Sequence, residues 1–212
     1  MITDRFKNWR RFSLRSLFIL MTLCCLVFGA WAAYVNPYRQ QQRSLAVVNR
    51  LQGNTVKAPA EGPPWNGWLV TTLLGEDAFM QVTEVELNGK QVTDEELGRL
   101  GGLIYLRKLS LDYTPVTDNG IATLHSMTNL QDVSLRYTKV ADRGAEHLGK
   151  LPALRFVHLT GTKITDAGVD HLARHPEMTE LYIRWTGITN TGAERLAAAL
   201  PNCAVYHHAL TP

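Results

Sequence analysis

Cysteine is scarce in this sequence. Three of its 212 residues are cysteines, and Cys24 and Cys25 both fall inside a long apolar run, so Cys203 is the one thiol in the rest of the chain. A single thiol forms neither an intrachain disulfide bond nor a cysteine-based zinc site. The sequence therefore excludes a disulfide scaffold and a zinc-finger fold.

Signatures of catalysis are also absent. The sequence has no phosphate-binding glycine loop, no G-x-S-x-G and no H-E-x-x-H. His171 and His175 are four residues apart, a spacing that can bind metal on a helix, but no third ligand follows nearby. We interpret both as exposed histidines of a helical surface. We predict no enzyme activity, no cofactor, no metal site and no small-molecule substrate.

An excess of basic charge is missing from most of the chain. The formal net charge is +3, but residues 1–16 hold five basic residues and one acid, whereas residues 36–212 hold 17 basic and 18 acidic residues. Binding to nucleic acid depends on a phosphate-neutralising excess of Lys and Arg. We therefore predict no nucleic-acid partner.

What the sequence does have is one long apolar segment near its start. Residues 17–35 carry no charge and are long enough, as a helix, to cross the hydrocarbon core of a bilayer. Trp31 and Tyr34 lie at its far end, where interfacial aromatic residues are favoured. We predict a single transmembrane helix that acts as a signal anchor. The alternative is a cleaved signal peptide, since Ala30-Trp31-Ala32 fits a cleavage site.

The basic residues before this segment outnumber those that follow closely after it. This bias favours a cytoplasmic N-terminus and export of the C-terminal part. We expect a single-pass membrane protein whose larger part is periplasmic or extracellular.

The rest of the chain repeats with a period of 24 residues. Five copies begin at Val82, Leu106, Leu130, Leu154 and Met178. Four columns recur in them: Val85, Leu109, Val133, Val157 and Leu181; Leu87, Leu111, Leu135, Leu159 and Ile183; Asp94, Asp118, Asp142, Asp166 and Asn190; and Leu100, Leu124, Leu148, Leu172 and Leu196. Such a period indicates a solenoid, in which each coil packs on its neighbours.

Within each copy, an alternating stretch such as Leu109-Ser110-Leu111 predicts a short strand with its leucines inside and Ser110 outside. Leu111→Asp should then unfold the repeats, while Ser110→Asp should change stability little. Buried threonines after each strand are expected to bond freed backbone groups, and Thr93, Thr117 and Thr165 are expected to cap helices. A recurring glycine, Gly120 in the second copy, indicates close backbone approach between neighbouring coils.

The register L-x-x-L-x-L-x-x-T-x-V/I-T-D-x-G-x-x-x-L resembles a leucine-rich repeat. Together with the basic tail and the apolar segment, it is similar to the bacterial membrane-anchored leucine-rich-repeat proteins. The resemblance implies an α/β solenoid, with short parallel strands on a concave face and helices on a convex face, behind one transmembrane helix. It also implies protein–protein interaction as the activity. A structural, self-associating envelope protein, a ubiquitin-ligase-adaptor-like repeat protein and an enzyme are the alternatives.

The concave surface of the later copies carries the residue types that dominate protein interfaces, aromatic residues and arginine. The candidate partner-binding residues are Phe156, His158, Tyr182, Arg184, Trp185, Arg136 and Tyr137. Ordinary surface positions, with Tyr137 and Trp185 packed on the adjacent turn, are the alternative. The partner itself is not identified by these residues.

The predicted organisation follows from these segments. It comprises a basic cytoplasmic tail (1–16), the transmembrane helix (17–35), a helix and Pro/Gly-rich linker (36–64), an N-terminal solenoid cap (65–81), five leucine-rich repeats (82–202) and a C-terminal cap and tail (203–212). Within residues 40–52 we expect a polar helix with Leu45, Val48 and Leu51 on one face. A last strand is expected near Val205.

Overall fold

The computed structural model describes residues 14–30, 36–59 and 80–208. The chain divides into two compact units, residues 1–39 and 40–212. The first unit contains helix α1 (Leu14–Ala30), which covers most of the predicted apolar segment, while residues 31–35 of that segment lie outside the described residues. Among the helices of the described ranges, none has both the length and the apolar character needed to cross a membrane.

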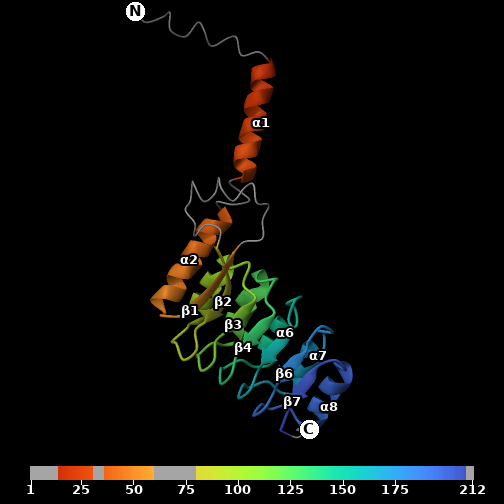
Figure 1. The fold of residues 1–212 in the computed structure, drawn as a ribbon. Coiled ribbons are helices and arrows are strands. Elements are labelled where there is room, and N and C mark those ends of the chain that lie inside the picture. Colours follow the sequence, from red (N-terminus) through yellow and green to blue (C-terminus); the bar gives the residue numbers. More distant parts are fainter. Residues whose placement is uncertain (1–13, 31–35, 60–79, 209–212) are drawn as a thin grey trace, which may run out of the picture. The chain divides into compact units, whose positions relative to one another are not determined.

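The second unit is an α/β fold in which strands and helices alternate (Figure 1). After α2 (Asn36–Arg50), which begins before the boundary between the units, come strands β1 (Asn54–Pro59) and β2 (Met80–Glu86). The remaining strands are β3 (Lys108–Ser110), β4 (Asp132–Ser134), β5 (Phe156–His158), β6 (Glu180–Tyr182) and β7 (Ala204–Tyr206). Between them lie the helices α4 (Asp94–Gly98), η4 (Arg99–Gly102), α5 (Asp118–Ala122), η5 (Thr123–Ser126), α6 (Asp142–Leu148), α7 (Asp166–Leu172) and α8 (Asn190–Ala199).

The strands form one sheet in the order β1 to β7, with β2 to β7 parallel and β1 antiparallel to β2. Its register confirms the 24-residue period, because Val85 pairs with Leu109 and the same column continues through Val133, Val157 and Leu181. One strand per copy is therefore stacked in sequence order. This is the arrangement of a solenoid of parallel strands.

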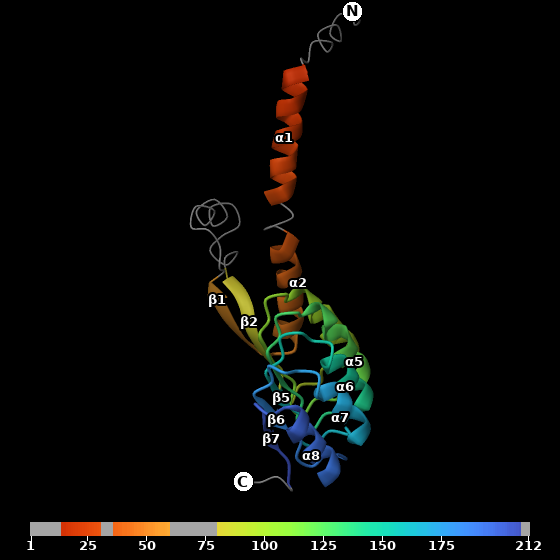
Figure 2. The same ribbon diagram turned by 90° about the vertical axis from the view of Figure 1, so that its right-hand side faces the viewer.

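The core lies between the sheet and the helices. Figure 2 shows α5 to α8 stacked along one side of this unit and strands β5 to β7 along the other. The leucines and valines of the repeating columns are buried, including Leu111, Leu124 and Leu172, with 0% of each side chain exposed. Burial of each such side chain contributes about 1.5–3 kcal/mol, so the repeated columns account for most of the driving force. We refer below to the opposite side of the sheet as the strand face.

The helix starts follow the predicted capping. Thr93 caps α4 in a full capping box with Glu96, and Thr117 and Thr165 accept from backbone N–H groups of α5 and α7. Thr189 does the same for α8, which was not predicted. The buried threonines after the strands also behave as expected. Each donates to a carbonyl three residues earlier: the buried Thr114, Thr138 and Thr162, and the half-buried Thr186.

The aspartate that starts each helix has a role that the sequence did not reveal. Asp94 accepts from the backbone N–H and the hydroxyl of Thr117, the capping residue one coil later, at 2.9 and 2.5 Å. Asp142 and Asp166 bond the next capping threonine in the same way. Glycine then recurs because a Cβ at Gly120 would come within 2.5 Å of an Asp94 oxygen. The close approach at this glycine is therefore to a side-chain carboxylate of the previous coil, whereas close approach of the backbones was predicted.

Helix α2 and strand β1 lie against the first coil. Leu45 and Val48 are buried in the core, as predicted, and Leu51 packs against it. The buried Gln41 side chain donates to the Met80 carbonyl at 2.8 Å and accepts from a backbone N–H of β2. Strand β1 lies within the segment expected to be a helix and linker, and it was not predicted. The expected cap over 65–81 falls almost wholly on residues 60–79, outside the described residues, and stays a prediction.

The C-terminal end has the expected last strand. In β7, Val205 continues the column of Leu181, and Tyr206 continues that of Tyr182. His207 is fully buried, with Nε2 3.1 Å from the Ile188 carbonyl, although the sequence offered no reason to place it inside. Burial raises the pKa of the Cys203 thiol to about 11, so this cysteine is not a reactive thiolate at neutral pH.

Candidate functional site

The strand face brings together part of the predicted set of binding residues. The register aligns Asp132, Phe156 and Glu180 in one row across β4 to β6, and it aligns His158 with Tyr182 in the next row. Because strands of a sheet lie about 4.8 Å apart, side chains in one row are direct neighbours. Phe156 and His158 on β5 and Tyr182 on β6 come from two neighbouring copies of the repeat and form one surface.

These side chains form an aromatic cluster. The rings of His158 and Tyr182 are stacked with centroids 4.5 Å apart, and Phe156 lies 5.6 Å from Tyr182. Tyr206 on β7 extends the stack, 4.2 Å from Tyr182 and within 10° of parallel. Tyr206 was not among the predicted residues, although it lies one period after Tyr182. Such contacts order the rings before any partner arrives, which lowers the entropic cost of binding.

Acidic groups border this aromatic cluster. Partial burial raises the pKa of the Asp132 carboxyl, with Lys108 opposing the rise and Glu84 and Glu180 adding to it. The Tyr182 hydroxyl donates to Glu180 at 2.9 Å. Desolvation, reinforced by Glu180, raises the pKa of Tyr182 to about 12, so its hydroxyl remains a donor at physiological pH. The cluster thus presents aromatic rings beside carboxylates.

A series of side-chain hydrogen bonds links the first coils on the same face. The Ser110 hydroxyl donates to Asn88 at 2.7 Å, and Ser134 donates to Asp112. Ser110 is buried, with 8% of its surface exposed. Ser110 is therefore not an exposed residue on the outside of the strand, as was expected, because its hydroxyl is bonded to the Asn88 side chain of the previous coil. Arg136 takes part in this series through its backbone N–H, which donates to Asp112 at 3.0 Å.

Tyr137 and Trp185, two further predicted residues, lie in the turns after their strands and not in the aromatic cluster. Tyr137 stacks on Tyr113 of the previous coil with centroids 4.9 Å apart, and Trp185 lies 6.1 Å from Tyr137. All three are exposed, and Arg184 beside Trp185 is exposed as well. Sequence reasoning missed Tyr113, although it lies one period before Tyr137. The predicted residues thus divide between the aromatic cluster and these turns.

The two histidines that are four residues apart, His171 and His175, do not both lie on an exposed helix. Helix α7 ends at Leu172, so His175 is not on the same helix as His171. His175 is buried, with Nε2 3.0 Å from the Leu148 carbonyl, and the interpretation of both as exposed histidines is wrong for His175. Burial lowers the pKa of His175 and so favours its neutral form. Across the described part of the chain, no three His, Cys, Asp or Glu side chains gather closely enough to hold a metal ion.

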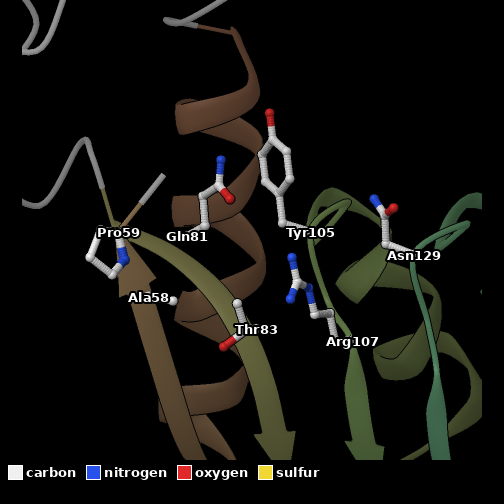
Figure 3. A pocket seen from close by; sticks show the side chains of 7 residues that line it. All are labelled: Ala58, Pro59, Gln81, Thr83, Tyr105, Arg107 and Asn129. Atoms are coloured by element: carbon white, nitrogen blue, oxygen red, sulfur yellow. The ribbon is translucent and has the colours of Figure 1, made fainter. Parts of the chain in front are cut away.

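A pocket of about 340 Å³ lies at the N-terminal side of the sheet (Figure 3). It is lined by Ala58, Pro59, Gln81, Thr83, Tyr105, Arg107 and Asn129. Figure 3 shows that these side chains come from β1, from β2 and from the segments that lead into β3 and β4. The pocket was not predicted, because it depends on β1 pairing beside β2.

Two solved structures are similar to part of this chain. Internalin C2 from Listeria monocytogenes has a similar structure, with 18% sequence identity, a TM-score of 0.44, and coverage of 61% of this chain and 70% of that one. A leucine-rich-repeat protein from Leptospira interrogans gives the same identity and TM-score and covers 64% of this chain. This chain spans only 38% of the Leptospira protein. No curated protein matches the sequence.

The Leucine Rich repeat family matches residues 150–173 and 175–197. These two stretches cover the coils of β5 and β6 together with helices α7 and α8. The parallel strands before them, from β2 to β4, continue the same period and the same register. Residues 150–173 and 175–197 are therefore similar to leucine-rich repeats, and the strands before them share the same register.

Proposed function

We propose that this protein is a membrane-tethered interaction module that binds a protein partner on the exported side of the membrane. The observation that carries the proposal is the aromatic cluster of Phe156, His158, Tyr182 and Tyr206 on the strand face. Aromatic side chains held in place by their neighbours are the usual anchors of protein interfaces. The exposed Arg184 follows Tyr182 by two residues, in the turn after β6.

Tethering to a membrane is supported by the composition of the first unit. Large apolar side chains are exposed along α1, among them Phe18, Leu20 and Leu23. A run of exposed apolar side chains is unfavourable in water and is typical of a surface that meets lipid or another apolar phase. The basic residues that precede it support a cytoplasmic N-terminus.

Membrane attachment and orientation can be tested together in cells that make the full chain. Extraction at alkaline pH should leave the protein in the membrane fraction. A reporter enzyme that is active only outside the cytoplasm, fused after Pro212, should be active. Release into the soluble fraction would contradict the tether, and an inactive reporter would contradict export.

Partner binding is tested by photo-crosslinking from the full-length protein. A photoreactive phenylalanine analogue replaces Arg184, two residues after Tyr182 in the turn that follows β6, or Arg174, which is exposed after α7 on the helical side. We expect a specific crosslinked protein from position 184 and none from position 174. Tyr182→Ala should abolish that crosslink while the protein remains folded. Equal crosslinking from both positions would contradict a binding site on the strand face.

A further inference from the structure

Three exposed aromatic residues share one position of the repeat. Tyr113, Tyr137 and Trp185 are spaced by multiples of 24 residues, with Gly89 and Gly161 at the equivalent positions of the other copies. All five residues have left-handed backbone conformations, with φ between 51° and 74°. Glycine adopts this conformation freely, whereas other residues pay for it, so the two glycines show what the turn alone would favour. The three aromatic residues therefore lower the stability of the fold through their backbone conformation. Strain of this kind is typical of residues that are kept for function.

Hydrogen bonds between coils hold these turns in place. The backbone N–H of Tyr113 donates to the Arg136 carbonyl, and that of Tyr137 donates to the Thr160 carbonyl, both at 2.8 Å. Gly161 donates to the Arg184 carbonyl at 2.9 Å. The left-handed residues thus continue the ladder of the sheet from one coil to the next. The backbone positions from which their side chains project are therefore fixed by hydrogen bonds to the next coil.

The rings form a continuous strip because Gly161 has no side chain. A Cβ on Gly161 would come within 2.6 Å of Cε1 of Tyr137, so the Tyr137 ring lies directly over this glycine. That position brings it toward Trp185, two coils away, and leaves the ring centroids 6.1 Å apart. Solvent reaches all three rings: 56% of Tyr113, 38% of Tyr137 and 67% of Trp185 is exposed. We call these three residues the aromatic strip.

Cations flank the aromatic strip. In each copy the left-handed residue is the second residue of a four-residue turn: 88–91, 112–115, 136–139, 160–163 and 184–187. Together these turns contain one acid, Asp112, and five basic residues: Lys90, Arg136, Lys139, Lys163 and Arg184. This contrasts with residues 36–212 as a whole, which have one more acid than base. Asp112 lies 4.0 Å from Arg136, so its charge is partly offset. Within the described residues, Lys139, Lys163 and Arg184 take part in no ion pair.

We propose that the aromatic strip and its flanking cations bind an extended acidic polysaccharide, such as one built from uronic acids. The exposed edges and outer faces of the aromatic rings would contact the apolar faces of the sugar units, while Arg and Lys side chains pair with the carboxylates. This ligand goes beyond the protein partner proposed above, and it occupies the turns and not the aromatic cluster.

The composition of the surface favours a glycan over an apolar peptide. Among the described residues of the second unit, the large hydrophobic side chains that are exposed are Val56 and the three residues of the aromatic strip. A protein interface usually combines aromatic anchors with an apolar core. Rings without aliphatic neighbours, among basic side chains, instead match the alternating apolar faces and anionic groups of an acidic sugar chain.

The test measures binding of polygalacturonate to the full chain in detergent micelles. Its methyl-esterified form is the matched neutral ligand. The informative variant is Trp185→Gly, because glycine suits the backbone conformation at that position and should leave the thermal transition close to that of the wild type. We expect affinity for polygalacturonate to fall about tenfold in this variant. Lys163→Gln should also weaken binding and reduce its dependence on salt, whereas Lys150→Gln on the helical side should not.

Several results would overturn the proposal. One is equal binding of the methyl-esterified polymer, which would remove the role of charge. Another is unchanged affinity in a folded Trp185→Gly protein, which would remove the role of the rings. Equal, Trp185-dependent binding of single-stranded oligothymidylate or of phosphatidylglycerol vesicles would replace the glycan by a general polyanion site. Because Tyr182→Ala leaves the aromatic strip intact, loss of the protein crosslink in that variant should not change polygalacturonate binding.

Discussion

The carboxylate of Asp142 accepts hydrogen bonds from both the backbone N–H and the hydroxyl of Thr165, at 2.7 and 2.8 Å. Thr165 in turn caps helix α7, so the first residue of one helix fixes the capping residue of the next. Each helix start is therefore coupled to the coil before it. The coupling is local in space although the two residues are 23 positions apart.

Removing this carboxylate should loosen the junction between two coils. We expect Asp142→Ala to lower the free energy of unfolding by about 1–2 kcal/mol, because two bonds to the capping threonine are lost. Asp142→Asn should lose less, since its carbonyl still accepts one bond. Chemical denaturation followed by circular dichroism measures both. The control is Asp170→Ala, which removes an exposed ion pair with Arg195 and should change stability by well under about 1 kcal/mol. Equal losses at both positions would contradict the coupling.

Substitution of Ser110 tests the polar bonds of the strand face. In Ser110→Asp, a carboxylate would replace the hydroxyl that donates to Asn88 and would face the Asn88 amide oxygen, which is held by the Asp112 backbone N–H. We expect a loss of about 2–3 kcal/mol in thermal or chemical unfolding, against about 1 kcal/mol for Ser110→Ala. Leu111→Asp, which buries an unpaired charge in the core, should prevent folding. A wild-type melting transition for Ser110→Asp would show that this side chain is free.

Gly161 and Gly89 form a matched pair for the turn position. Both have left-handed backbones, but a Cβ at Gly161 would press on the Tyr137 ring, whereas a Cβ at Gly89 has nothing within 4 Å. Gly89→Ala should cost about 1 kcal/mol from backbone strain alone. Gly161→Ala should cost more, about 2–3 kcal/mol, because the ring must also move. The excess should vanish when Tyr137→Gly is added, and its persistence would mean that the ring does not lie on Gly161.

Burial of His175 predicts a dependence of stability on pH. Its pKa is lowered in the folded protein, while in the unfolded chain it has the ordinary value of about 6.5. Below that value the unfolded chain takes up a proton that the folded protein resists, so the free energy of unfolding should fall between about pH 7.5 and pH 5.5. His158, whose pKa is also lowered by burial, adds to the same trend.

His175→Gln separates this contribution from the others. Glutamine keeps an N–H donor for the Leu148 carbonyl but does not titrate. The loss of stability from pH 7.5 to pH 5.5 should therefore be smaller in this variant than in the wild type. The exposed His125 is the control, and His125→Gln should lose as much stability as the wild type over that range. The same loss in wild type and His175→Gln would contradict the assignment.

The period predicted the solenoid because few other folds can bury apolar residues that recur every 24 residues. Once Leu109 and Leu111 are placed inside a strand, their equivalents at 24-residue spacing must stack beside them. The threonine caps followed for the same reason, since they depend on local sequence. What the period could not predict are contacts that depend on the reach of a side chain. The bonds between Asp94 and Thr117 and between Ser110 and Asn88 are examples.

Three further features could not be predicted from the period. Strand β1 lies outside the repeats and owes its pairing to β2, so nothing in its own sequence required it. Tyr113 and Tyr206 follow the period, but the sequence did not show that their rings stack on Tyr137 and Tyr182. For that reason neither was among the predicted binding residues. The aromatic residues of the turns satisfy the period while opposing the local backbone preference, and only the φ angles reveal this.

The regular register has a consequence for chain length. Deleting residues 130–153 would join Asn129 to Leu154, and every strand would still find a neighbour in register. Asp118 would then face Thr165 in place of Ala141 and would gain the hydroxyl that alanine lacks. A shortened chain of this kind would keep its ends and its bonding pattern. Insertions and deletions are thus neutral in multiples of one coil and disruptive at other lengths, which makes the number of coils a quantity that gene duplication can adjust.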